Sequence, residues 1–149
     1  MERTLIIIKP DAVQRGLAGE ILARLERRGL HFAGLRMIEI TPDLAARHYA
    51  EHVGTGVYEG LVRYITSSPV LVAAVEGPGA ISAVRQSMGS TKPLEAAPGT
   101  IRGDFALTVA NNLVHGSDSP ESAERELSLF FQRHELFSYR RDIDRWIAE

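Results

Sequence analysis

Hydrophobic residues fall along the chain in short runs that predict strands separated by helices. The runs RTLIIIK (3–9) and PVLVAAVEG (69–77) are short and rich in β-branched residues, which is typical of buried strands. LHFAGLRMIEI, which ends at Ile40, predicts a third strand. DFALTVA (104–110) is expected to be the last strand.

The spacing of apolar and capping residues predicts helices between these strands. Apolar residues at 17, 21, 22 and 25 share one helical face, and Gly29 is placed to end that helix. Thr41 and Pro42 form a start signal for a helix that reaches about His52. Further helices are expected from Tyr58 to Ile65, before Gly89, and after the start signal Ser119–Pro120–Glu121.

The resulting order, β-α-β-α-α-β-α-β-α, allows two architectures. One is a parallel, doubly wound sheet, and the other is a split, antiparallel α+β sandwich. The pattern does not decide between them. The chain has 149 residues and 44% hydrophobic content, so residues 1–149 are expected to form one domain. The stretch from Ser90 to Gly103 predicts a long loop, and such loops are often functional.

Composition narrows the classes of protein. The net charge of −2 disfavours a non-specific nucleic-acid binder, which is usually markedly basic. The absence of cysteine excludes disulfides, thiolate nucleophiles and cysteine-bound zinc. The N-terminal apolar run is too short for a signal peptide, and the run Val70–Val75 is far shorter than the ~20 residues that span a bilayer. We therefore expect a soluble, cytoplasmic protein with no membrane partner.

One histidine is placed unusually for a structural residue. His115 stands beside Gly116 in what the pattern predicts to be a polar turn. A neutral imidazole, with a reference pKa of ~6.5, is a nucleophile or base at neutral pH. Glu126 is expected on the flank of a helix, where it can bond one ring nitrogen and leave the other free. The plain alternative, a loop histidine with no role, is the commoner case for a lone histidine.

Three scattered cations form a second candidate. Lys9, Arg85 and Arg102 lie at predicted element ends and loops, where ligand-binding groups gather. If they converge, they suit a polyphosphate, with Thr91 as an added donor. Without a fold, solvated surface charges are the simpler interpretation.

HYAEH (48–52) is a competing signal, because it matches the H-x-x-E-H motif of zinc peptidases. On a helix, His48 and His52 would share a face and Glu51 could serve as the base. Such a site needs a third protein ligand, and no later helix offers an obvious one. P-loop and G-x-S-x-G motifs are absent, so Ser117 and Ser119 are first assigned to turn formation and helix capping.

Three segments resemble one known family. NNLVHGSDSPESAERE (111–126) is similar to the active-site signature of nucleoside diphosphate kinases, N-x-x-H-G-S-D-S-x-x-S-A-x-x-E. TLIIIKPDAVQRGLAGEI (4–21) resembles their first strand and helix, and KPLEAAPGTIRGDF (92–105) resembles their long loop. The similarity covers nearly the whole chain in order, so the chain is identified as a member of this family.

The resemblance implies a ping-pong transfer of the γ-phosphate of a nucleoside triphosphate, typically ATP, to a nucleoside diphosphate. His115 would attack through Nδ1 and carry the phosphate. Glu126 would orient the ring, Ser117 would help to position Glu126, and Asn112 would bond the ribose. A non-catalytic relative that only binds nucleotides or partners remains a rival, and the intact His115 and Glu126 argue against it.

The same resemblance assigns further contacts and a metal. The residues that match the family's phosphate, sugar and base contacts are Lys9, Tyr49, Val57, Leu61, Arg85, Thr91, Arg102 and Val109. Mg²⁺ is expected on the nucleotide phosphates, with Asp118 as an outer-shell carboxylate. His48 and His52 would then be bystanders on the helix that supplies Tyr49.

The family's fold is a ferredoxin-like α/β sandwich with a four-stranded antiparallel sheet. Its members form hexamers, or tetramers in some bacteria, and we expect a hexamer of two trimers. The 90–103 loop and the C-terminal RWIAE (145–149) resemble parts used in assembly. One departure is Val57, where the family usually has an aromatic residue that stacks on the base, which predicts weaker stacking. Lys92 replaces a commoner asparagine, and we assign it no role.

Overall fold

The computed structural model describes residues 1–148, so Glu149, the last residue of RWIAE, lies outside the described residues. Four antiparallel strands form one sheet in the order β2-β3-β1-β4. The strands are β1 (Glu2–Ile8), β2 (His31–Ile38), β3 (Val70–Gly77) and β4 (Val114–Gly116). The antiparallel α+β sandwich is therefore confirmed, and the parallel doubly wound alternative is wrong.

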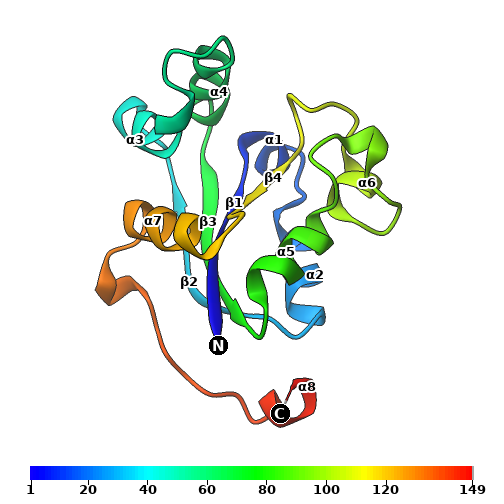
Figure 1. The fold of residues 1–149 in the computed structure, drawn as a ribbon. Coiled ribbons are helices and arrows are strands. Elements are labelled where there is room, and N and C mark those ends of the chain that lie inside the picture. Colours follow the sequence, from blue (N-terminus) through cyan, green and yellow to red (C-terminus); the bar gives the residue numbers. More distant parts are fainter. Residues whose placement is uncertain (149) are drawn as a thin grey trace.

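Helices cover both faces of this sheet (Figure 1). The α-helices are α1 (Pro10–Gln14), α2 (Ala18–Arg27), α3 (Pro42–His48), α4 (Tyr58–Ile65), α5 (Ala80–Met88), α6 (Ile101–Phe105), α7 (Pro120–Phe130) and α8 (Asp144–Ile147). Three short 3₁₀ turns are η1 (Ala50–His52), η2 (Pro93–Glu95) and η3 (Arg133–Glu135). In the described chain, no helix is both long and apolar enough to cross a membrane.

The central strand β1 is apolar throughout because both of its faces are buried. Ile6 and Ile8 pack with α2 and α5 on one face, whereas Leu5 and Ile7 pack with α3, α4 and α7 on the other. All four side chains are fully buried. A strand buried on both sides loses the alternation of polar and apolar residues, which explains why the run LIII was readable as a strand without a period of two.

Two helix starts have the predicted caps. The Thr41 side chain accepts a hydrogen bond from the Leu44 N–H, and the Ser119 side chain accepts one from the Ser122 N–H. Each cap satisfies a backbone donor that the first helical turn leaves without a partner. The Ser119 cap is important for function because it fixes the start of α7, the helix that carries Glu126.

The expected last strand, DFALTVA, is wrong. Thr100 caps α6 by accepting a hydrogen bond from the Gly103 N–H, so Asp104 and Phe105 are helical. The residues that follow have no neighbouring strand, and Leu107 and Val109 are 74% and 54% exposed. The fourth strand is instead β4, which has only three residues and pairs with β1 at the sheet edge. Apolar residues at positions 105, 107 and 109 resemble the alternation of a strand, but they do not form one in this structure.

Other differences from the sequence-based expectation are smaller. Pro10 begins the short helix α1 rather than only ending β1. The helix expected from Thr41 to His52 breaks at Tyr49 into α3 and η1. The predicted loop from Ser90 to Gly103 contains η2 and the start of α6.

Candidate active site

Strand β4 presents His115 to the sheet face that α3 and α7 cover. His115 pairs with Ile7, whose side chain packs on that face. Its neighbours Val114 and Gly116 belong to the other face, where a Cβ on Gly116 would lie 2.7 Å from the Met88 sulfur. Because strand side chains alternate, the histidine is held by a paired backbone and not by a loose turn. The prediction of a polar turn at His115 is therefore wrong, because the residue lies in a strand that is hydrogen-bonded to β1.

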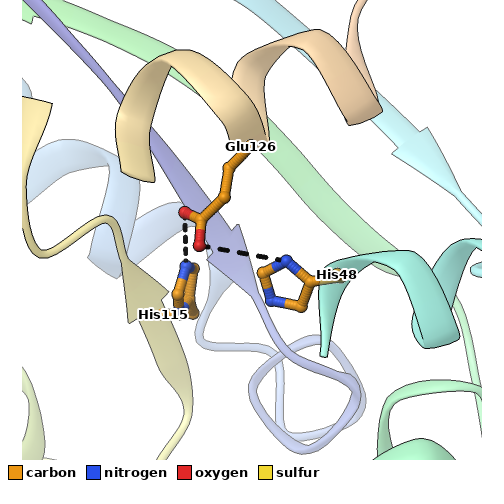
Figure 2. A group of neighbouring side chains, drawn as sticks. All are labelled: His48, His115 and Glu126. Carbon is orange, nitrogen blue, oxygen red and sulfur yellow. Dashed lines mark hydrogen bonds and ion pairs between the residues drawn. The ribbon is translucent and has the colours of Figure 1, made fainter. Parts of the chain in front are cut away.

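The carboxylate of Glu126 holds this histidine from α7. Its Oε1 lies 2.9 Å from His115 Nε2 (Figure 2). The same oxygen accepts a hydrogen bond of 2.6 Å from the Ser117 hydroxyl. Burial by itself would raise the pKa of Glu126, but its bonds to His115 and Ser117 lower that pKa to about 2. The charged carboxylate requires a proton on Nε2, so the lone pair of the neutral ring is on Nδ1.

His48, at the end of α3, completes the cluster and is not the bystander that we expected. It is 6% exposed, its ring centre lies 4.9 Å from that of His115, and its Nδ1 lies 4.0 Å from Glu126 Oε2. Burial, with a contribution from His115, lowers the pKa of His48 to about 3. A neutral ring therefore packs beside His115. The other two residues of the H-x-x-E-H motif, Glu51 and His52, are exposed on η1.

Four cations line the same cavity, which measures about 290 Å³. Arg125 lies 3.8 Å from Glu126 Oε2, and the other three are those expected from the sequence. Lys9 follows β1, and its Nζ donates to Asn112 Oδ1 at 2.9 Å. Arg85, on α5, donates to the Gly116 carbonyl oxygen at 3.2 Å. Burial and the Arg102 charge lower the pKa of Lys9 to about 8, and burial and the Arg85 charge lower that of Arg102 to about 10. Burial is the larger cause of both shifts, and the second cause shows that these positive charges lie close together.

Arg102 also organises the backbone beside the histidine. Its guanidinium donates to the carbonyl oxygens of Asn112, Gly89 and Val114 at 3.2, 3.1 and 2.6 Å. The side chain is buried, and these three carbonyl oxygens accept hydrogen bonds from all three of its guanidinium nitrogens. Arg102 thus fixes the segment that leads directly into β4.

Asp11 and Tyr64 support that segment and were missed by the sequence analysis. Leu113 has a φ of 75°, in the left-handed region that non-glycine residues rarely adopt. Its N–H donates to Asp11 Oδ2 at 3.2 Å, its carbonyl accepts from the Lys9 N–H at 2.9 Å, and the Tyr64 hydroxyl donates to the other Asp11 oxygen. The available signal was an acid directly after Lys9-Pro10, at the end of a buried strand.

The structure brings most of the expected site residues to one cavity. Those that line it are Lys9, Tyr49, Arg85, Thr91, Arg102, Asn112, His115, Asp118 and Glu126. Ser117 does not line the cavity, but its hydroxyl donates a hydrogen bond to Glu126 Oε1. Val57, Leu61 and Val109, expected at the base, do not line this cavity. Val57 and Val109 are more than half exposed.

An oriented imidazole that shares a cavity with Lys9, Arg85 and Arg102, none of which forms an ion pair in the described residues, is suited to accepting a phosphoryl group. The imidazole supplies the nucleophile, and the cations stabilise the charge on the transferred group. Together with the antiparallel α+β sandwich, this site defines a phosphotransferase.

Comparison with known proteins identifies the family. Residues 2–136 match the family model described as nucleoside diphosphate kinase. Over 147 residues, and 99% of both chains, the sequence is 61% identical to the nucleoside diphosphate kinase of Thermomicrobium roseum. It is 58% identical to that of Chloroflexus aggregans over the full length of both chains. The chain belongs to the nucleoside diphosphate kinase family.

Solved structures agree with this assignment. A halophilic nucleoside diphosphate kinase from Halobacterium salinarum, solved in complex with CDP, has a TM-score of 0.97 at 47% identity, covering 99% of both chains. A family protein from Babesia bovis has a TM-score of 0.96 at 44% identity, covering 99% of this chain and all of the other. The function is therefore the ping-pong transfer of a γ-phosphate between nucleotides through a phosphohistidine, and the zinc-peptidase hypothesis is wrong.

The three carbonyl contacts of Arg102 lead to a stability prediction. Arg102→Lys can remake one of the three bonds, so we expect the free energy of unfolding to fall by about 2 to 4 kcal/mol. Urea unfolding measures this change. The matched control, Arg85→Lys, gives up a single bond from an exposed side chain and should cost about 1 kcal/mol or less. Equal losses in the two variants would contradict the organising role of Arg102.

Proposed function

We propose that His115 is the residue that carries the phosphate. Nδ1 attacks the γ-phosphorus, an N–P bond forms, and the bond from that phosphorus to the bridging oxygen breaks as the diphosphate leaves. The 2.9 Å contact between Glu126 Oε1 and His115 Nε2 carries this proposal, because it leaves Nδ1 as the nitrogen with the lone pair. The phosphorylated ring keeps its Nε2 proton and is positively charged, and the adjacent carboxylate stabilises that charge.

The cavity cations and polar groups are proposed to bind the nucleotide. Lys9, Arg85, Arg102 and Thr91 would hold the phosphates, while Tyr49 and Asn112 would contact the phosphate and sugar. The relative from Halobacterium salinarum was solved with CDP, which supports a nucleoside diphosphate as occupant. Divalent cations serve this family, and we propose Mg²⁺, held mainly by phosphate oxygens and water. Asp118, exposed on the cavity rim, is proposed as an outer-shell carboxylate.

We propose that the base lies at the mouth of the cavity, against Val57, Leu61 and Val109. The exposure of Val57 and Val109, 58% and 54%, supports an open contact for an apolar ring. Aliphatic side chains cover a base but have no π-face to stack on it. Base contacts in this chain would therefore contribute little to affinity, and the phosphate contacts would dominate it.

A homo-oligomer, with a hexamer favoured over a tetramer, and a cytoplasmic location complete the proposal. β2 is an edge strand, and Leu35 and Met37 on it are 49% and 60% exposed. Leu94, in the 90–103 loop, is 83% exposed. An apolar sheet edge and an apolar loop are surfaces that a second copy can cover.

Light scattering of the purified protein tests the assembly. A mass six times that of the 16.4 kDa chain is expected, and a tetramer would give four times that mass. Introducing a charge on the sheet edge, Met37→Glu, should lower the mass. A monomer at all protein concentrations would contradict the proposal.

Phosphate labelling tests the nucleophile. The enzyme alone, given γ-labelled ATP, should take up label in an acid-labile form, and addition of a diphosphate should remove it. His115→Gln should abolish uptake, because an amide nitrogen has no lone pair available for attack. His134→Gln, at an exposed histidine of η3 that does not line the cavity, is the matched control and should label like the parent. Label that persists in His115→Gln, or that resides on a serine, would overturn the assignment.

Replacing Val57 by phenylalanine tests the base contact. Val57→Phe should tighten ADP binding by about tenfold, which corresponds to one added stacking contact of about 1.4 kcal/mol. Val53→Phe adds the same ring to another exposed valine of this segment and should leave affinity unchanged. Titration calorimetry measures both. No gain in Val57→Phe, or an equal gain in both variants, counts against the proposal.

A further inference from the structure

We propose that His48, His115 and Glu126 form a binding site for a transition-metal dication such as Zn²⁺, and that metal binding and phosphorylation of His115 exclude each other. The exclusion rests on the proposed role of His115 as nucleophile, whereas the binding site itself does not. This site is different from the H-x-x-E-H motif, with which it shares only His48.

The three side chains already lie close enough for coordination. Each offers one ligand atom, and these atoms all lie within 4.8 Å of one another. Figure 2 shows the two rings approaching the carboxylate from β4 and α3, each facing a different oxygen of Glu126. In the part of the chain that the structure describes, no other group of histidine and acidic residues has this spacing. Side chains from α3, β4 and α7 thus converge on one point.

An unpartnered nitrogen points to a ligand at this place. His48 Nδ1 is buried without a hydrogen-bond partner, and the His48 side chain is only 3% exposed. At 4.0 Å, the nearest carboxylate oxygen is too distant for a hydrogen bond. A buried polar atom without a partner is costly. A metal ion between the two rings and the carboxylate would give this nitrogen a partner.

The ligand types select the class of metal. Two imidazole nitrogens and one carboxylate oxygen suit Zn²⁺ and its neighbours Co²⁺, Ni²⁺ and Cu²⁺. Mg²⁺ prefers oxygen ligands, so the site does not compete for the ion on the nucleotide. Three protein ligands leave a fourth position open to water.

Metal and phosphate would compete through the Nε2 atom of His115. A metal on Nε2 displaces the proton that this nitrogen donates to Glu126. In a neutral ring that proton moves to Nδ1, which then has no lone pair for attack on a phosphate. Once Nδ1 carries a phosphate, Nε2 holds its proton and has no lone pair for a metal. Lys9, Arg85, Arg102 and Arg125 line the same cavity and repel a dication, and Arg125 lies 3.8 Å from Glu126 Oε2. The negative charge of Glu126 is therefore essential to the site.

Zinc titration of the nucleotide-free protein tests the site. Zinc chloride is added to the full chain with a competing zinc indicator, without Mg²⁺. We expect one ion per chain, and His48→Gln, Glu126→Gln and His115→Gln should each weaken binding by at least about tenfold. Glu51→Gln and His52→Gln are matched controls and should bind like the parent. Cobalt chloride should give the visible absorption of a tetrahedral site.

Three outcomes would overturn the site. These are unchanged binding in His48→Gln, loss of binding in His52→Gln, or binding without fixed stoichiometry, which would mean an adventitious ion only. If His48→Gln does not fold by circular dichroism, His48→Asn takes its place.

A second arm tests the competition. Parent enzyme phosphorylated with ATP and freed of nucleotide by gel filtration should bind zinc at least about tenfold more weakly than the unphosphorylated enzyme. Unchanged affinity would overturn the exclusion. If His115 proves not to carry the phosphate, the labelling experiment reports that failure, and the zinc titration still decides whether the site exists.

Discussion

The buried carboxylate of Glu126 determines the chemistry of the whole pocket. It accepts hydrogen bonds from His115 Nε2 and from the Ser117 hydroxyl. It therefore connects α7 with the strand that carries the nucleophile. Its charge is favourable only because these partners offset the cost of burial. The helix cap at Ser119 and the short pairing of β4 with β1 are therefore parts of the same site, since both fix where this carboxylate meets the ring.

Three of the four cations of the cavity are held by neutral acceptors, which leaves their charge available. Lys9 bonds an amide oxygen, Arg85 bonds one backbone carbonyl, and Arg102 bonds three. Within residues 1–148, none of the three forms an ion pair with a carboxylate. Positive charges fixed in this way repel one another, so binding of the proposed polyphosphate would reduce that repulsion.

The sequence predicted the chemistry of the site better than its local structure. The signature around His115 and Glu126 specified the family and hence the fold, and the hydrophobic runs marked three of four strands. The last strand failed because β4 is only three residues long and its partner, β1, is far away in sequence. His48 was misjudged because its neighbours in sequence, Glu51 and His52, matched a motif. Its true neighbours, His115 and Glu126, come from other elements, and spacing along one segment cannot reveal such a convergence.

The left-handed backbone of Leu113 has a consequence for motion. A glycine would adopt this φ without cost, yet the side chain here is fully buried in the core. Burial of the leucine side chain therefore offsets the cost of its strained backbone. The residue keeps this unusual conformation only while the core around it is intact. Any fluctuation that releases this residue must also open part of the hydrophobic interior. The backbone amides of residues 112–114 should consequently be as resistant to hydrogen exchange as those of the sheet, unlike the amides of an ordinary surface loop.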